Sequence, residues 1–178
     1  LDADAYGLRM MADRLPELLV ASSCSKNFGL YRERTGSITM IAESAEQAKI
    51  VSAQSMSTAR QIYSMPPAHG ALLVSLILGD DQLRANWQAE LEEVRLRIKS
   101  MRTLLTDGIN NNAAGMDFSH IKQQQGMFSF LGITSDQLNR LREEFAIYIV
   151  GSTRVNLAGI NSNNIEYLTQ SIRTVLDS

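Results

Sequence analysis

The stretch Ser23-Cys24-Ser25-Lys26-Asn27-Phe28-Gly29-Leu30-Tyr31-Arg32-Glu33-Arg34 is the most informative part of this 178-residue sequence. It follows Leu18-Leu19-Val20, which we interpret as a short buried strand, so one lysine is presented among small hydroxyl residues where a strand ends. A lysine amine that is desolvated near other cations loses its proton more easily and can attack a carbonyl carbon. Most lysines are solvated surface charges, and Lys26 taken alone leaves that alternative open.

Three further strings follow in order: RQIYSMPPAHG at residues 60–70, GMFSF at residues 126–130 and RVNLAG at residues 154–159. With the lysine stretch, they resemble the aspartate and aromatic-amino-acid aminotransferases, which are class I enzymes of fold-type I. The resemblance covers essentially the whole sequence. It implies an α/β fold, the C-terminal part of a fold-type I aminotransferase. It also implies that the family's N-terminal half, which carries the groups around the cofactor ring, has no counterpart in this sequence.

The resemblance implies pyridoxal 5′-phosphate as cofactor, joined to the amine of Lys26, which is also the expected catalytic proton carrier. Arg34 and Ser23 are the expected phosphate ligands, since a guanidinium offers a fixed fork of donors and a hydroxyl adds another. Both have simpler alternatives. Arg34 could form a surface ion pair with Glu33, and the Ser23 hydroxyl could bond the backbone at the end of a strand.

The same resemblance assigns the substrate residues. Arg154 is expected to hold the α-carboxylate in a bidentate clamp, and Arg60 to reach from the neighbouring subunit to a distal carboxylate. Their alternatives are an exposed edge charge and a solvated helix arginine. Tyr63 and Ser64 are expected in the site shared by the dimer. Phe128 is expected to line the substrate pocket, with a core phenylalanine as the alternative.

The implied function is transamination between an aspartate, glutamate or aromatic amino acid and a 2-oxo acid such as 2-oxoglutarate. The expected mechanism is ping-pong, through aldimine and pyridoxamine forms of the cofactor, in a cytoplasmic homodimer with shared active sites. Two alternatives stay open: a non-catalytic regulator with an aminotransferase-like cofactor-binding domain, and an inactive fragment of the enzyme. The arginine at residue 60 does not separate dicarboxylic from aromatic substrates.

Composition argues against other classes of function. The net charge of −2 gives no reason to expect nucleic acid or an anionic membrane as a partner. One cysteine, Cys24, excludes a disulfide within the sequence and fits a reducing compartment. Two histidines and one cysteine give no metal-ligand spacing, so no metal is expected. The longest apolar run, Ala71 to Leu78, is too short to span a bilayer.

Periodicity and capping signals predict the elements of the first half. We expect a strand over 37–42, a helix from a capping box at 44–47 to about Tyr63, and an apolar, buried helix over 68–78 after Pro66-Pro67. An apolar stripe from Leu83 to Leu105 predicts a long helix over 81–106 whose stripe is core. On its other face we expect an ion pair between Glu93 and Arg97. A boundary near Glu92 would divide the remainder of a large cofactor-binding domain, 1–92, from a small domain, 93–178.

For the rest of the chain, the predicted elements follow the same rules. They are a polar loop over 107–115, a strand over 120–125, a strand or turn over 127–130, a helix over 134–146 with a capping box, paired strands over 147–150 and 153–158, and a last helix over 163–176. Mixed strands and helices of these lengths are typical of the α/β class.

Overall fold

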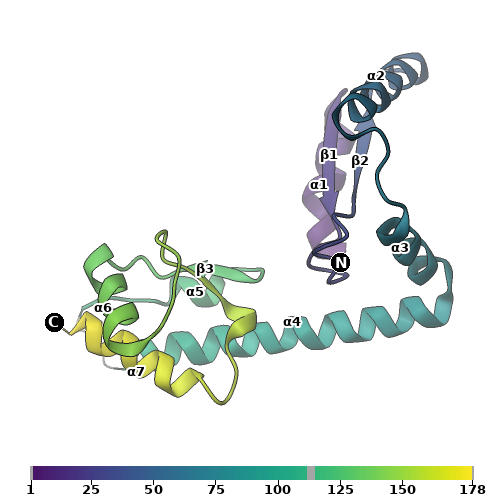
Figure 1. Ribbon diagram of the computed structural model, residues 1–178. Helices are drawn as coiled ribbons and strands as arrows, with labels where there is room; N and C mark the ends of the chain where they lie inside the picture. Colours follow the sequence, from purple (N-terminus) through teal and green to yellow (C-terminus); the bar gives the residue numbers. More distant parts are fainter. Residues whose placement is uncertain (1, 112–114, 178) are drawn as a thin grey trace. The chain divides into compact units, whose positions relative to one another are not determined.

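The computed structural model describes residues 2–111 and 115–177. The chain divides into two compact units, Leu1–Trp87 and Gln88–Ser178 (Figure 1). In the described residues each unit contains one two-stranded antiparallel sheet together with helices. The predicted boundary near Glu92 lies a few residues beyond the point at which the units meet.

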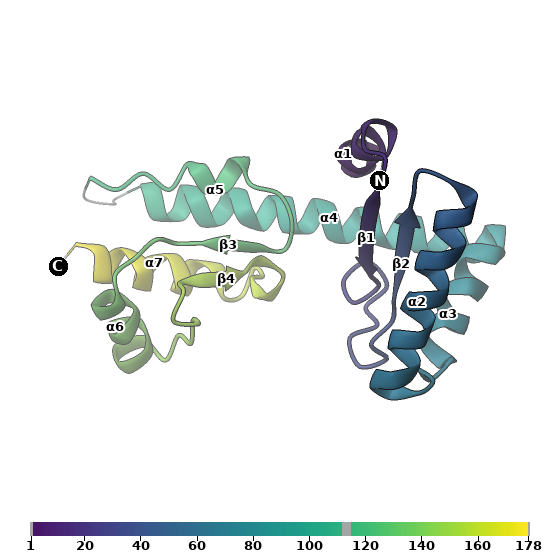
Figure 2. The same cartoon turned by 90° about the horizontal axis from the view of Figure 1, so that it is seen from above.

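A hairpin organises the first unit. Strand β1 (Leu18–Ser23) pairs with β2 (Gly36–Ile41), and Ser23 lies opposite Gly36 where the connection between the strands begins. Both strands were predicted, but the expected burial of the first is not observed, because Leu19 is 65% exposed. Figure 2 shows helix α2 (Ala45–Tyr63) alongside β2, and the Ser55 hydroxyl of α2 donates to the Met40 sulfur of β2 at 3.3 Å. This helix therefore covers one side of the hairpin.

Helices complete the first unit. The predicted start of α2 is confirmed, because the Ser44 hydroxyl accepts a hydrogen bond from the Gln47 amide at 3.2 Å. Helix α3 (His69–Gly79) also lies where it was predicted. Helix α1 (Asp2–Arg14) is an element that the periodicity arguments above do not predict.

The second unit contains most of the long helix α4 (Asp81–Asn110), which continues four residues past the predicted end at 106. The predicted loop at 107–115 is therefore helical up to Asn110, while its third asparagine, Asn112, lies outside the described residues. The remaining elements are α5 (His120–Gln123), β3 (Phe128–Phe130), α6 (Ser135–Phe145), β4 (Arg154–Asn156), the 3-10 turn η1 (Leu157–Gly159) and α7 (Ile165–Leu176). The predicted capping box at the start of α6 is confirmed, with Thr134 and Gln137 bonding each other's backbone.

Two strand predictions in this unit are wrong. Residues 120–123 form the short helix α5, because the Asp117 carboxylate accepts the Ser119 amide and starts a helical turn. Residues 147–150 have no strand partner among the described residues; β4 pairs with β3 instead, with Ser129 opposite Val155. The predicted strand over 153–158 is shortened to β4, since η1 follows it directly.

The buried hydrophobic core belongs to the second unit. Its members are Leu105, Ile109, Phe118, Ile121, Leu131, Ile133, Leu141, Val155, Leu157, Ile160, Ile172 and Val175. The expectation that the whole stripe of α4 is core is therefore wrong for its first part: Leu83 is 39% exposed and Val94 is 45% exposed. The expected burial of α3 is also not observed, because Leu72 and Leu76 are 65% and 61% exposed.

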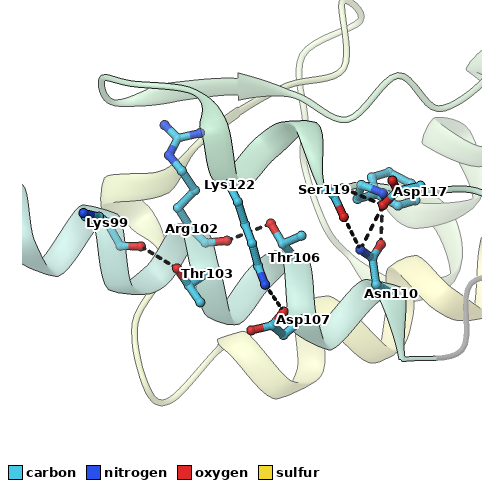
Figure 3. Close-up of polar contacts among 10 residues, drawn as sticks. Lys99, Arg102, Thr103, Thr106, Asp107, Asn110, Asp117, Ser119 and Lys122 are labelled. Carbon is cyan, nitrogen blue, oxygen red and sulfur yellow. Dashed lines mark hydrogen bonds and ion pairs between the residues drawn. The ribbon is translucent and has the colours of Figure 1, made fainter.

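Arg102 of α4, labelled in Figure 3, is a cation with only 2% of its surface exposed. Its guanidinium donates to the carbonyl of Ile121 at 3.0 Å, to the carbonyl of Gly126 at 2.7 Å and to the Ser129 hydroxyl. Burial lowers the pKa of this guanidinium from its ordinary value. The side chain thus ties α4 to α5 and β3 through neutral acceptors.

A second arginine of α4 corrects the expected ion pair. Arg97 donates to the carbonyls of Ala158 and Ile160, each at 3.0 Å, instead of pairing with Glu93. Carbonyls at the end of a 3-10 turn lack helical partners, so they offer a fixed acceptor pair for the guanidinium fork.

None of the helices in the described ranges combines the length and apolarity needed to cross a bilayer.

Candidate active site

Lys26 lies in the connection between β1 and β2, which we call the lysine loop (residues 24–35). The Cys24 amide donates to the Thr35 carbonyl at 3.0 Å, which continues the hairpin ladder into the loop. The Cys24 carbonyl then accepts the amides of Phe28 and Leu30, both at 3.3 Å. Gly29 adopts φ +67°, a left-handed conformation that glycine reaches without steric cost. The loop is thereby folded back around the lysine.

The side chain of Lys26 is exposed and lies against one aromatic ring. Its Nζ is 4.6 Å from the centroid of the Tyr31 ring, within the range of a cation–π contact. Tyr31 itself is 47% exposed. The amine is therefore held at the surface of the first unit, where a ligand can reach it.

Two hydroxyls precede the lysine. Ser23 Oγ donates to Ser25 Oγ at 3.0 Å and accepts the Ser25 amide at 3.2 Å. Ser23 thus makes the hydrogen bond to the backbone that its simpler alternative expects. It also bonds the hydroxyl of Ser25, a residue that the sequence did not single out. Ser25 is only 6% exposed. The serines on either side of Cys24 are the sequence pattern that could have identified Ser25.

Arg34 closes the other end of the loop with a backbone φ of +51°, which is unusual for a residue other than glycine. Its Nη1 donates to the Tyr31 carbonyl at 3.2 Å, so the ion pair with Glu33 is not what holds this side chain. A guanidinium has five donor hydrogens. Most of them stay available for an anion, because Arg34 has no other partner among the described residues.

The start of α3 packs closely against the same end of the loop. Gly70 is buried, and a Cβ added there would lie 1.9 Å from Thr35 Oγ1 and 2.8 Å from Glu33 Cβ. Only glycine allows this approach. Gly70 therefore helps to fix the segment that carries Arg34, and the sequence argument did not identify it.

The donor set of the lysine loop fits a phosphorylated aldehyde. One amine able to form a covalent bond, the Ser23–Ser25 hydroxyl pair and the Arg34 guanidinium all lie within residues 23–34. These residues are the ones that would hold pyridoxal phosphate.

Arg60, Tyr63 and Ser64 lie together at the end of α2. Ser64 caps the helix with φ +64°, and its amide donates to the Arg60 carbonyl at 2.9 Å. The Tyr63 side chain is 54% exposed. The exposed guanidinium of Arg60 has no hydrogen-bond or ion-pair partner within residues 2–111 and 115–177.

Arg154 and Phe128 lie together on the sheet of the second unit. The two are diagonal neighbours on paired strands, and Arg154 Cζ lies 4.7 Å from the centroid of the Phe128 ring. Phe128 is 36% exposed, so it is not a core phenylalanine in the described residues. The guanidinium carbon lies over the face of the ring, and no hydrogen bond or ion pair of Arg154 within the described residues occupies its donors.

Comparison with known proteins gives the family. The model of the family described as "Aminotransferase class I and II" matches residues 2–172. The chain belongs to this family. It is 53% identical over 176 residues to the aspartate aminotransferase of Haemophilus influenzae, covering 99% of the chain and 44% of that protein. It is 44% identical to the aromatic-amino-acid aminotransferase of Pseudomonas aeruginosa, over 98% of the chain and 44% of that protein.

Solved aminotransferases have the same fold. The aromatic-amino-acid aminotransferase from Burkholderia pseudomallei, described as covalently bound to pyridoxal phosphate, superposes with a TM-score of 0.93 at 41% identity. That match covers 98% of the chain and 44% of the solved one. The fold of this aminotransferase chain is therefore that of a C-terminal portion of the fold-type I enzymes, as predicted. The chain spans less than half the length of the relatives described here.

The predicted site residues fall into three groups in the structure. Lys26 and Arg34 lie in the lysine loop, and Ser23 directly precedes it at the end of β1. Arg60, Tyr63 and Ser64 share one end of α2, and Phe128 and Arg154 share the sheet of the second unit. Each group is local in its own unit, and each keeps at least one exposed cation.

Proposed function

We propose that this chain supplies the lysine, the phosphate arginine and the substrate arginines of a pyridoxal-phosphate-dependent aminotransferase. Its reaction would transfer an amino group between aspartate, glutamate or an aromatic amino acid and a 2-oxo acid such as 2-oxoglutarate. The observation that carries the proposal is the segment around the lysine loop, where Lys26 lies, along the sequence, between the Ser23–Ser25 hydroxyl pair and Arg34, whose guanidinium has donors to spare. Membership of the class I and II aminotransferases supports it.

The residues of the lysine loop would divide the work. Pyridoxal phosphate, when bound, supplies the electron sink for breaking a bond at the substrate α-carbon. Lys26 Nζ would hold the cofactor and, once released, would carry the proton taken from the substrate α-carbon. Arg34 and Ser23 would neutralise and orient the phosphate, since charge-assisted bonds to phosphate oxygens are short and directional. Ser25 would hold the Ser23 hydroxyl in place.

Two arginines would hold the substrate. Arg154 would clamp the α-carboxylate, and its contact with the Phe128 ring would restrain the guanidinium fork. Fixing the carboxylate orients the α-C–H bond, which is a positional contribution to the rate. Arg60, with Tyr63 and Ser64 beside it, would meet a distal carboxylate in the active site of the neighbouring subunit of a cytoplasmic homodimer. Its lack of a partner in the described residues supports this assignment.

Residues 1–92 would be the remainder of the large cofactor-binding domain, and residues 93–178 the small domain. The meeting point of the two compact units supports a division near this boundary.

Borohydride reduction followed by peptide mass measurement tests the cofactor assignment. After loading with pyridoxal phosphate, we expect a reduced phosphopyridoxyl group on the peptide that contains Lys26 and none on the peptide that contains the exposed helix residue Lys49. Lys26→Ala should abolish the adduct, whereas Lys49→Ala should leave it unchanged. Equal labelling of both peptides would mean surface chemistry and would overturn the proposal.

Substrate kinetics test the arginines. Arg154→Lys should raise KM for all amino-acid substrates, because a point charge replaces a bidentate fork. Arg60→Met should raise KM for aspartate by about tenfold or more and leave the KM for phenylalanine nearly unchanged. If Arg60→Met weakens both substrates equally, the assignment of a distal-carboxylate role is wrong.

A further inference from the structure

Trp87, near the start of α4, contacts the lysine loop in two ways. Its indole Nε1 donates to the carbonyl of Asn27 at 2.7 Å. Its ring stacks on the ring of Phe28, with centroids 4.6 Å apart and planes within 9° of parallel. Asn27 and Phe28 are the two residues that directly follow Lys26, so one contact falls on the backbone and the other on the side chain next to the proposed catalytic amine.

The hydrogen bonds of the loop itself leave this segment incompletely held. The Lys26 carbonyl accepts the Gly29 amide at a long 3.4 Å, and the Phe28 and Leu30 amides reach the Cys24 carbonyl at 3.3 Å. The shortest bond to the segment is the one from Trp87. Stacked aromatic rings add a preferred orientation to that single bond. The indole therefore supplies the firmest attachment of the backbone that carries Lys26.

We infer that Trp87 is a positioning residue for Lys26, an inference that rests on the proposed function. The indole N–H fixes the direction of the Asn27 carbonyl, and the stack fixes Phe28, so the peptide unit after Lys26 keeps one orientation. Trp87 acts through these two residues. Positioning of a reacting group to well under 1 Å is a large part of catalysis, so loosening this segment reduces cofactor attachment before it reduces stability.

Substitutions separate the two contacts. Trp87→Phe keeps an aromatic ring for stacking and removes the donor, while Trp87→Leu removes both. Phe28→Leu removes the stack without altering α4, which keeps the test valid if a tryptophan variant fails to fold. Gln88→Ala changes the next, exposed residue of the same helix and serves as the matched control.

The measurement is the labelling of Lys26 in the holoenzyme, by reduction and peptide mass, as a function of pyridoxal phosphate concentration. We expect the half-labelling concentration to rise about fivefold for Trp87→Phe and about thirtyfold for Trp87→Leu, with the same maximal labelling. Gln88→Ala should match the unsubstituted protein. The pH midpoint of the absorbance of the Lys26-bound cofactor should also move in both tryptophan variants and stay fixed in the control.

Tryptophan fluorescence gives a second readout, which does not depend on enzymatic activity. Trp87 is the one tryptophan in the sequence. Its fluorescence is obtained by subtracting the emission spectrum of Trp87→Phe from that of the unsubstituted protein. Because the indole lies beside the lysine loop, loading with pyridoxal phosphate should quench this emission, and Lys26→Ala should prevent covalent quenching.

The outcomes distinguish a failure of the proposed function from a failure of the role of Trp87. An unsubstituted protein without labelling at Lys26 overturns the proposed function and the inference with it. Normal labelling in Trp87→Phe, with a half-labelling concentration within about twofold of the control, overturns the role of Trp87 and leaves the proposed function standing. A reduced maximum with an unchanged half-labelling concentration would mean that Trp87 only stabilises the fold, which also overturns the inference.

Discussion

The first and second units differ in where their apolar side chains lie. All the buried hydrophobic residues of the described chain belong to the second unit, between Leu105 and Val175. In the described part of the first unit no large apolar side chain is fully buried, and many are exposed, including Leu19 at 65%, Met56 at 72% and Leu72 at 65%. A two-stranded hairpin without a core is marginally stable in water. The proposed cofactor site therefore lies in the unit that depends more on being covered by another surface.

A matched pair of leucines tests this contrast and carries the largest expected effect. Leu141→Ala on α6 removes a fully buried side chain and should lower the free energy of unfolding by about 2–5 kcal/mol. Leu72→Ala on α3 should change it by no more than about 0.5 kcal/mol, because the side chain is 65% exposed. Urea unfolding followed by circular dichroism measures both. Equal losses would show that α3 is covered in solution and would break the comparison.

Arg102 tests the same comparison with a buried polar side chain of the second unit. Arg102→Met removes the donor shared by two carbonyls and one hydroxyl and should cost about 2–3 kcal/mol. The same substitution at Lys99, an exposed residue of the same helix, should be nearly neutral. Chemical denaturation of the two variants side by side gives the difference. A neutral Arg102→Met would mean that packing alone holds α4 against β3.

Gly70 is a closely packed position of the first unit. Gly70→Ala places a methyl group against Thr35 and should cost about 1–3 kcal/mol while weakening binding of pyridoxal phosphate. Gly79→Ala, in the same helix, meets no heavy atom within 4 Å and should be neutral or stabilise by about 0.5 kcal/mol. Thermal unfolding and cofactor titration measure the pair. If both variants behave alike, the lysine loop does not depend on α3.

Asp117 gives the smallest expected effect. Hydrogen bonds from Ser119, with a further one from Asn110, lower the pKa of this carboxyl from its ordinary value. A lowered pKa in the folded state means that the carboxylate stabilises the second unit above the ordinary carboxyl pKa. This contribution is lost as the pH falls through that value toward the lowered one. Urea midpoints measured across this acidic range should fall less in Asp117→Asn than in the unsubstituted protein, and parallel curves would exclude the effect.

Sequence patterns predicted the elements that carry a local signal of their own. The capping residues Ser44 and Thr134 correctly mark the starts of α2 and α6, because a hydroxyl that bonds an amide three residues ahead is a short-range interaction. The lysine loop was found by its motif. Arg102 and Trp87 could not be assigned, since their partners lie 19 to 27 and 60 residues away and no spacing rule relates them.

The wrong strand over 147–150 has an instructive cause. Ile147 and Ile149 pack against the core while Tyr148 and Val150 are 80% and 51% exposed, so the alternation that predicted a strand is present. What the described residues lack is a neighbouring strand for this segment, since β4 pairs with β3. Alternation reports which side of an extended segment is buried. Pairing depends on the path of the chain beyond it.

The contact between Arg154 and Phe128 has a consequence for the entropy of ligand binding. A free arginine side chain samples many rotamers, and fixing them costs up to about 2 kcal/mol. With Arg154 Cζ already 4.7 Å from the ring centroid, part of that freedom is given up during folding. A carboxylate that reaches Arg154 meets a guanidinium with few orientations left to lose, so more of the hydrogen-bond energy remains as affinity.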